Sequence, residues 1–472
     1  MQAFIDFFTG ALNDFAWLYM FLPCVMVGGI LLTVRTKAVQ FSHFGYAMKN
    51  PVGKMFKKTE AGKGAVTPLQ AVTTALAATV GTGNIVGTSQ AIALGGYGAV
   101  FWLWVAALLG MVIKYSEVVL SIQYRQRDEK GDWVGGPMYY IAGIGPKWKW
   151  LAMVYAALAG IACFGIGNMS QVNAITGSIT NAITAFFTIN DSGITVIHWV
   201  IGLSLAALVA LILLGGIKRI GKVAEKLVPI MSVFYVLVCL GVIFSHVGNI
   251  GGAFAKIFTA AFSPRAVLGA ASGIALKEAL VWGLRRSAFS NEAGLGSAAI
   301  AHAAAETPSA VHQGLYGIFE VFVDTIVICS MTALTIICSG VDINFGVKPG
   351  SELITAAVAT IFGGKLAALF VAGALILFAF STVLGWALYG SRCAQYLFGT
   401  KAIKYYQAAF AIVIVIGCVS PIDIVWNIAD TFNGLMAIPN FVGLFVLSGV
   451  VAKLTKEHFS DPAAMLEDEM YT

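Results

Sequence analysis

Charged residues are scarce in this chain of 472 residues: they make up 11% of it, whereas hydrophobic residues make up 58%. Soluble domains carry roughly 25% charged residues. The apolar residues fall into about eleven runs of roughly 18–30 residues, and a helix needs about 20 to cross a bilayer. The composition therefore excludes an ordinary soluble domain and predicts an all-α polytopic membrane protein with about eleven transmembrane helices.

Motifs for metal, redox or catalytic chemistry are also missing. The seven cysteines are scattered singly and the six histidines form no cluster, unlike the ligands of a zinc or dithiol site. The sequence has no nucleophile–base pair and no phosphate-binding loop, so it predicts neither an enzyme nor an organic cofactor. Residues 1–14 contain no Lys or Arg, unlike the start of a secretory signal.

The expected spans alternate with basic and non-basic connections. They cover residues 15–34, 66–95, 99–121, 150–174, 195–217, 226–246, 266–284, 314–338, 364–390, 403–420 and 423–451. Basic residues gather in the first connection and in every second one after it, which the positive-inside rule places in the cytoplasm. This predicts a multi-pass protein of the cell (inner or plasma) membrane, with its N-terminus outside and its C-terminus cytoplasmic. The net charge of +6 thus sets topology and does not indicate a nucleic-acid partner.

The second span contains the stretch Thr79–Gly87, which combines three glycines with the polar residues Thr79, Thr82 and Asn84. Each glycine lowers helix propensity by about 1 kcal/mol. In lipid, irregular backbone is tolerated only where protein or a wet cavity surrounds it. The stretch therefore indicates either a functional break in mid-membrane or a close helix–helix contact through small residues.

The ten spans after the first fall into two sets of five, and each set begins with an interrupted helix. We expect an N-terminal segment at 1–65, a first repeat at 66–246, a second repeat at 247–451 and a cytoplasmic tail at 452–472. The second break is expected at Gly269–Gly273. Each half has five spans, an odd number, so the halves have opposite orientations, as in inverted-repeat transporters. The segment Phe289–Ser297 is expected at the cytoplasmic mouth, as a gate or as a plain connection.

A broken helix offers free amides to an anion at one end and free carbonyls to a cation at the other. No charged side chain lies between Val66 and Leu94, which favours a neutral zwitterion over a charged solute. In the ninth span, the hydroxyls of Ser381 and Thr382 are hard ligands suited to sodium, or they bond to their own helix. Trp386, one turn further on, is a candidate pocket wall or a packing residue.

Other polar groups in the spans leave two interpretations open. Gln171 is a candidate substrate partner or an interhelical hydrogen-bond donor. Lys114 and Glu117 lie three residues apart and are expected to pair with each other. Asp324 and Asp430 are candidate proton carriers or structural hydrogen-bonding groups. Proton-coupled transport and a solute channel are therefore alternatives to sodium coupling.

Several motifs together resemble the alanine or glycine:cation symporter family. They are Gly81–Gly87, Gly135–Ile141, Gly167-Asn168 with Gln171, Phe289–Ser297 and Asp430–Met436. The resemblance extends from about Val66 to Pro439. It implies a leucine-transporter-type fold of ten core helices in two inverted fives, here preceded by one additional helix. It also implies sodium-coupled import of small neutral amino acids.

The same resemblance implies residue roles. The substrate carboxylate would lie at the amides of Thr82 and Gly83, next to Asn84. The pocket would be closed by Gln171, by the break at Gly269–Gly273 and by Trp386. The sodium ion would be held by the carbonyls of Ala77, Val80 and Phe378 and by the hydroxyls of Ser381 and Thr382.

Overall fold

The protein is helical almost throughout. The structure, a computed structural model, describes residues 7–54, 62, 64–262, 276–420, 423–461 and 463. In that part, nine helical stretches are long and apolar enough to cross a membrane. The predicted span 66–95 is present as an interrupted helix of α6 (Pro68–Thr79), η3 (Gly83–Gly87) and α7 (Thr88–Gly95), and the described part of the span predicted at 266–284 lies in α15 (Leu276–Asn291). The prediction of an all-α polytopic membrane protein is therefore confirmed.

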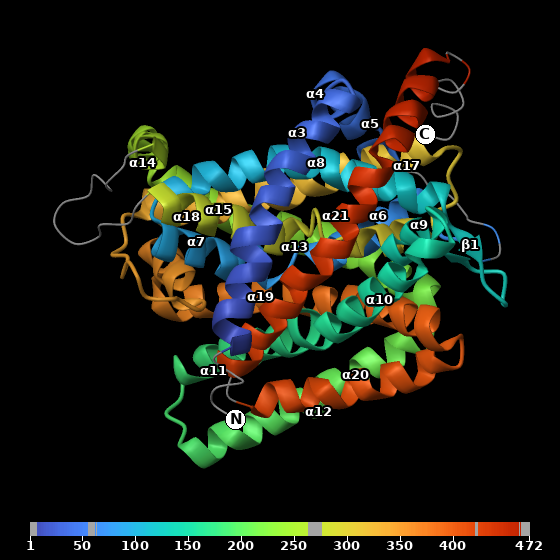
Figure 1. Cartoon of the computed structure of the whole chain (residues 1–472). Helices are drawn as coiled ribbons and strands as arrows, with labels where there is room; N and C mark the ends of the chain where they lie inside the picture. Colours follow the sequence, from blue (N-terminus) through green and yellow to red (C-terminus); the bar gives the residue numbers. More distant parts are fainter. Residues whose placement is uncertain are drawn as a thin grey trace.

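An additional helical span precedes the core. It consists of η1 (Phe7–Ala11), α2 (Leu12–Asp14), η2 (Phe15–Phe21) and α3 (Leu22–Arg35), followed by the short helices α4 (Val39–Ser42) and α5 (Phe44–Lys54). In Figure 1, α3 lies beside α21 (Asp423–Ser460), the last helix of the chain.

The first five core spans contain these elements. They are α6 (Pro68–Thr79), η3 (Gly83–Gly87), α7 (Thr88–Gly95), α8 (Gly98–Gln123), α9 (Pro137–Gly143), η4 (Pro146–Trp148), α10 (Lys149–Phe164), η5 (Gly165–Met169), α11 (Ser170–Thr184), α12 (Asp191–Leu213) and α13 (Gly216–Ser245). A short antiparallel hairpin of β1 (Gln126–Arg127) and β2 (Trp133–Val134) connects α8 to α9. A capping box formed by Thr67 and Gln70 fixes the start of α6.

The second set contains the remaining elements. They are η6 (Val247–Asn249), α14 (Ile250–Phe262), α15 (Leu276–Asn291), α16 (Ser297–His302), α17 (Ala310–Val321), η7 (Phe322–Cys329), α18 (Ser330–Ser339), α19 (Glu352–Phe398), α20 (Ala402–Val419) and α21. Gly363, at φ 74°, bends α19 just before the predicted ninth span. Figure 1 shows α12 and α20 side by side along one edge of the bundle.

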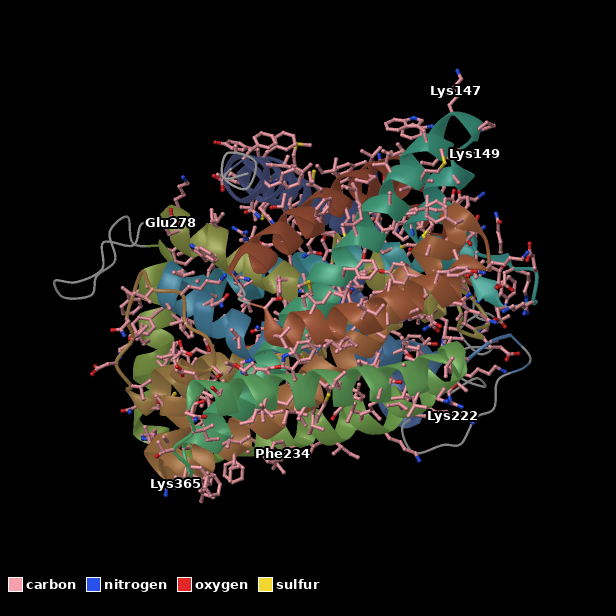
Figure 2. The ribbon with its side chains drawn as sticks, turned by 90° about the horizontal axis from the view of Figure 1, so that it is seen from below. Lys147, Lys149, Lys222, Phe234, Glu278 and Lys365 are labelled. Carbon is pink, nitrogen blue, oxygen red and sulfur yellow. The ribbon has the colours of Figure 1, made fainter. Side chains whose placement is uncertain are left out.

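Lysines of two connections predicted to be basic lie at one end of the molecule. Figure 2 shows Lys147, Lys149 and Lys222 projecting at one end, whereas Glu278 and Lys365 project at the opposite end. This separation agrees with the alternation of the connections in the sequence.

The additional helix is fixed to the core by a polar junction. Arg285 forms an ion pair with Asp430, and it donates to the side-chain oxygen of Asn13 at 2.7 Å. The indole of Trp17 donates to the carbonyl of Asp430 at 2.9 Å. Asp430 was interpreted as a proton carrier or as a structural hydrogen-bonding group, and the structure shows it in the second role.

Small residues bring α15 and α17 close to α8. A Cβ atom added at Gly283 would lie 2.5 Å from the carbonyl oxygen of Ala99 and 2.7 Å from the Cβ of Trp102. At Gly317 the nearest atom would be Cγ of Lys114, at 3.0 Å. Without a hydrophobic driving force between helices in lipid, such close packing is a main source of association.

We expect Gly283→Val to destabilise the protein because the added side chain forces α15 away from α8. Overpacking of this kind costs about 1–3 kcal/mol. Gly373→Val in α19, where nothing lies within 4 Å, is the matched control. Melting of both variants in detergent, followed by size-exclusion chromatography, measures the difference. Equal melting temperatures would contradict the close approach of α15 and α8.

Candidate functional site

The first predicted break is present. α6 ends at Thr79, and Val80 has an extended conformation with φ −77° and ψ 90°. The amide of Gly81 donates to Oδ1 of Asn84 at 2.8 Å, where a continuing helix would have used the carbonyl of Ala77. The end of α6 therefore offers carbonyl oxygens that have lost their helical partners.

Gln171 lies at this break, where a substrate partner is expected, and it also forms hydrogen bonds to the protein itself. The amide of Thr82 donates to Oε1 of Gln171 at 3.3 Å, and Nε2 of Gln171 donates to the carbonyl of Ile166 at 3.0 Å. The hydroxyl of Thr82 is buried and has no hydrogen-bond partner among the described residues. One weakly held amide and one unpaired hydroxyl thus meet at the same point.

The hydroxyls of α19 face the carbonyl end of the break. Ser381 and Thr382 donate to the carbonyl of Phe378 at 2.8 and 3.1 Å, so the bonding within the helix is observed. Thr382 also reaches the carbonyl of Val80 at 3.5 Å. A Cβ atom at Gly81 would lie only 2.3 Å from Oγ1 of Thr382. The structure thus brings Val80, Phe378, Ser381 and Thr382 together, with Ala77 one turn earlier in α6.

Trp386 packs against the fourth span. It is buried, and a Cβ atom at Gly167 would lie 2.1 Å from its Cβ. The neighbouring amide Asn168 donates to the carbonyl of Phe410 at 2.8 Å and serves as an interhelical contact. Gly167 therefore allows α19 to approach η5 closely. Gln171 follows η5 directly in the chain, in the first turn of α11.

A second interruption separates α15 from α16. Three residues there have positive φ: Glu292 at 57°, Gly294 at 93° and Gly296 at 75°. The expected break at Gly269–Gly273 lies outside the described residues. The segment Phe289–Ser297, predicted at the cytoplasmic mouth, is buried: α15 continues through Asn291 and the turn after it is buried as well.

Side chains from three other helices hold this second turn. The amide of Gly294 donates to Oε1 of Glu117 at 3.0 Å. Asn440 donates to the same oxygen at 2.7 Å and to the carbonyl of Gly294 at 2.8 Å. The hydroxyl of Tyr155 donates to the carbonyl of Leu295 at 3.0 Å. The turn is therefore a built feature, with its polar backbone paired by residues from α8, α10 and α21.

Asp324 connects the two interruptions. Its Oδ1 accepts from Nδ2 of Asn84 at 2.7 Å, and its Oδ2 accepts from the hydroxyls of Ser290 at 2.8 Å and Thr325 at 2.7 Å. A Cβ atom at Gly83 would lie 3.1 Å from Cα of Ser290, so η3 and α15 are in direct contact. Asn84 is thus a structural residue of the break, and the sequence analysis missed Ser290.

The expected pairing of Lys114 with Glu117 is wrong. Nζ of Lys114 lies 3.3 Å from Oε1 of Glu320 in α17, and both side chains are fully buried. Nε2 of His302 lies 3.1 Å from the other oxygen of Glu320. Proximity on one helix predicted the partner incorrectly, because the chain brings a carboxylate from another helix to the same point.

The β1–β2 hairpin covers the end of the molecule that carries the basic connections. Arg125 donates to the carbonyl of Ala303 at 3.1 Å, beyond α16. Gln395 in α19 donates to Oδ2 of Asp128 at 2.8 Å, and Arg392 lies 3.6 Å from that oxygen. Partial burial raises the pKa of Asp128, but these contacts and two backbone amides outweigh it and hold the pKa below its usual range.

The sequence matches the sodium:alanine symporter family over residues 1–471. The chain belongs to this family. It is 42% identical over 456 residues to the sodium/alanine symporter AgcS of Methanococcus maripaludis, covering 95% of this chain and 96% of that protein. It is 36% identical over 464 residues to the amino-acid carrier protein AlsT of Bacillus subtilis, covering 97% and 93%. The family transports its substrates and is not a family of enzymes.

A solved structure supports the fold class. The structure of MhsT in complex with L-phenylalanine superposes with a TM-score of 0.59, covering 85% of this chain and 99% of that chain at 14% identity. At this identity the likeness shows the fold alone. It confirms the expected leucine-transporter-type architecture for this symporter.

We expect Asp324→Asn to destabilise the protein, because an amide nitrogen then faces one of the three donors that the carboxylate accepts. A buried donor without a partner costs about 1–3 kcal/mol. Asp191→Asn, at an exposed position at the start of α12, is the matched control. Melting temperatures of the two purified variants test this. A loss no larger than that of the control would show that Asp324 does not hold the breaks together.

Proposed function

We propose that this symporter couples sodium to the import of small neutral amino acids, alanine or glycine, by alternating access. The observation that carries the proposal is the first break. There, the amide of Thr82 bonds to Gln171 at 3.3 Å, while the carbonyl of Val80 lies 3.5 Å from the hydroxyl of Thr382. An anion-binding end and a cation-binding end are thus adjacent in one helix.

The substrate carboxylate binds at the amides of Thr82 and Gly83. Its oxygens replace Oε1 of Gln171 as acceptors, and the buried hydroxyl of Thr82 supplies another donor. The aromatic side chains of Phe289, close to Gly83, and of Trp386, close to Gly167, would line the substrate site. The names of the relatives AgcS and AlsT agree with an amino-acid substrate. A second part of the pocket, the Gly269–Gly273 segment, remains a prediction.

The sodium ion binds between α6 and α19. Its ligands are the carbonyls of Ala77, Val80 and Phe378 and the hydroxyls of Ser381 and Thr382. These five oxygens are hard donors of the kind that oxygen-preferring cations select. The hydroxyls now donate to the carbonyl of Phe378, and rotation toward the ion frees that carbonyl as well.

Alternating access moves the two repeats, 66–246 and 247–451, against each other, with the N-terminal segment 1–65 and the tail 452–472 outside the repeats. At the hairpin end, the contacts from Asp128 to Arg392 and Gln395 must break for release. Beside α7 and α11 lies a cavity of about 250 Å³ whose lining includes Gln90 and Asn173. It offers a path to the first break from the other end.

The chain resides in the cell (inner or plasma) membrane with its N-terminus outside and its C-terminus in the cytoplasm. The projection of Lys147, Lys149 and Lys222 at one end supports this orientation. The hairpin end is then cytoplasmic, and the Gln90 cavity opens outward.

We expect Thr382→Ala to raise the sodium concentration needed for half-maximal alanine uptake by about tenfold, equal to about 1.4 kcal/mol of ion binding. Trp386→Ala should mainly raise the alanine KM, because the indole lies away from the ion ligands. Uptake of labelled alanine into liposomes with and without a sodium gradient gives both values. Equal sodium effects in the two variants would contradict the ion site, and accumulation without a gradient would exclude the coupling.

Gly81→Ala should abolish sodium-dependent alanine binding, because its Cβ overlaps Oγ1 of Thr382 and approaches Oε1 of Gln171 to 3.3 Å. Gly87→Ala is the matched control, because its nearest atom, Cδ of Arg286, lies at an ordinary 3.7 Å. Scintillation proximity binding measures both variants. If Gly81→Ala binds alanine as the wild type does, the substrate and the ion do not bind at this break. A panel of unlabelled amino acids in the same assay defines the preferred substrate.

A further inference from the structure

We propose that Glu292 binds a proton in the conformation seen here and releases it when the turn between α15 and α16 opens, which makes the proton a second ion linked to transport. The proposal rests on the transport function proposed above and gives a role to the turn between α15 and α16. The observations concern the backbone of Glu292, the surroundings of its carboxyl group and its link to α19.

The backbone of Glu292 is in an unfavourable conformation for its residue type. Its φ of 57° lies in the left-handed region, which a non-glycine residue enters only at an energetic cost. The next two positive-φ residues of the turn, Gly294 and Gly296, are glycines. A glycine at 292 would relieve the strain, so a glutamate here indicates a use for its side chain.

The carboxyl group of Glu292 is buried without a cation beside it. The residue is 1% exposed, and its Oε2 accepts from the hydroxyl of Ser297. The indole of Trp386 is a second hydrogen-bonding group. Within the described residues, no ion pair joins Glu292 to Lys, Arg or His. An isolated carboxylate in a low-dielectric interior is so costly that it takes up a proton instead.

The neighbouring groups do not supply the missing charge. The titratable groups that face Glu292 are Lys114 on α8, Glu320 on α17, Tyr389 on α19 and Cys163 on α10. Lys114 is the cation of this group, and it is already paired with Glu320 at 3.3 Å. Its positive charge is therefore matched before Glu292 is considered.

Two more groups flank the turn, and neither neutralises Glu292. Nδ1 of His302 lies 2.8 Å from Nε2 of Gln313, and its Nε2 lies 3.1 Å from Oε2 of Glu320, so both ring nitrogens are directed at groups other than Glu292. Oε1 of Glu117 accepts from the Gly294 amide and from Asn440, so this carboxyl group is used to hold the turn. Glu117 therefore supplies no positive charge to Glu292.

Opening of the break would give this proton a path to water. The O–H bond of the Glu292 carboxyl group breaks, the proton passes to water, and the carboxylate is hydrated in place of its contacts with Ser297 and Trp386. Because Trp386 lies one turn from Thr382 on α19, the same movement displaces the helix that carries the sodium ligands. Acid therefore favours the closed conformation, and base favours the open one.

The first experiment needs no substrate. Infrared spectra of the full-length protein in lipid should contain the carbonyl stretch of a protonated carboxyl group, and Glu292→Gln should remove it. Glu278→Gln, on the same helix but projecting at one end of the molecule (Figure 2), is the matched control and should keep the band. Persistence of the full band in Glu292→Gln would overturn the proposal. If Glu292→Gln fails to fold, Ser297→Ala should shift the band by removing its hydrogen bond, and an unshifted band would also overturn it.

The second experiment measures the linkage. A solvated glutamate titrates near pH 4, so exposed carboxyl groups do not change charge between about pH 6 and about pH 8. Over this range the wild-type apparent alanine affinity should change by up to about tenfold per pH unit, the limit for one linked proton. Glu292→Gln should change by less than about twofold. Wild-type pH dependence in this variant would overturn the proposal. A higher alanine KM with unchanged pH dependence would instead assign Glu292 to the substrate.

The two proposals fail separately. If the wild type shows no sodium-driven uptake of alanine, the transport proposal fails, while the infrared band still decides whether Glu292 is protonated. If uptake requires sodium but the band is unaffected by Glu292→Gln, the transport proposal stands and the proton site is wrong.

Discussion

In a bilayer, each backbone amide and carbonyl must find a partner within the protein, and both helix interruptions depend on how side chains meet this requirement. At the first, Asn84 accepts from the Gly81 amide at 2.8 Å. At the second, Glu117 accepts from the Gly294 amide at 3.0 Å, and Asn440 donates to the carbonyl of the same glycine. Each break thus keeps a defined geometry, and a few groups near Thr82 and Val80 are left weakly bonded where a ligand can use them.

The shared carboxylate of Asp324 makes the two breaks one mechanical unit. It accepts from Asn84 on the first break and from Ser290 on the last turn of α15. If α15 moves away from η3, the carboxylate must give up one of these bonds. Buried polar networks are costly when only partly satisfied. The two interruptions are therefore expected to move together, so that a ligand bound at one changes the conformation of the other.

Periodic and compositional features of the sequence predicted the spans and an irregular stretch at 79–87, and the resemblance placed Gln171 beside it. The Gly-Thr-Gly run at 81–83 was compatible with a break or with close helix packing, and the structure shows that α6 ends there. The turn between α15 and α16 was not predicted as a break, whereas the break expected at Gly269–Gly273 lies outside the described residues. Only the contacts of Gly294 with Glu117 and Asn440, 177 and 146 positions away in the chain, distinguish a buried turn from a surface connection. Pairing of Lys114 with Glu320 is likewise set by tertiary contact.

Helix α8 is the element against which these features are arranged. Lys114 binds the carboxylate of α17, Glu117 holds the turn after α15, and Ser121 donates to the carbonyl of Ala299 in α16 at 2.7 Å. These three residues, spaced at three and four positions, lie on one face of the helix. One rigid face thus fixes both sides of the second break. A left-handed glutamate persists only where its surroundings over-determine it, and this face of α8, together with Asn440 and Tyr155, provides such surroundings. The strain at Glu292 can then be released only by a movement that separates the turn from α8, which is the opening that exposes its carboxyl group.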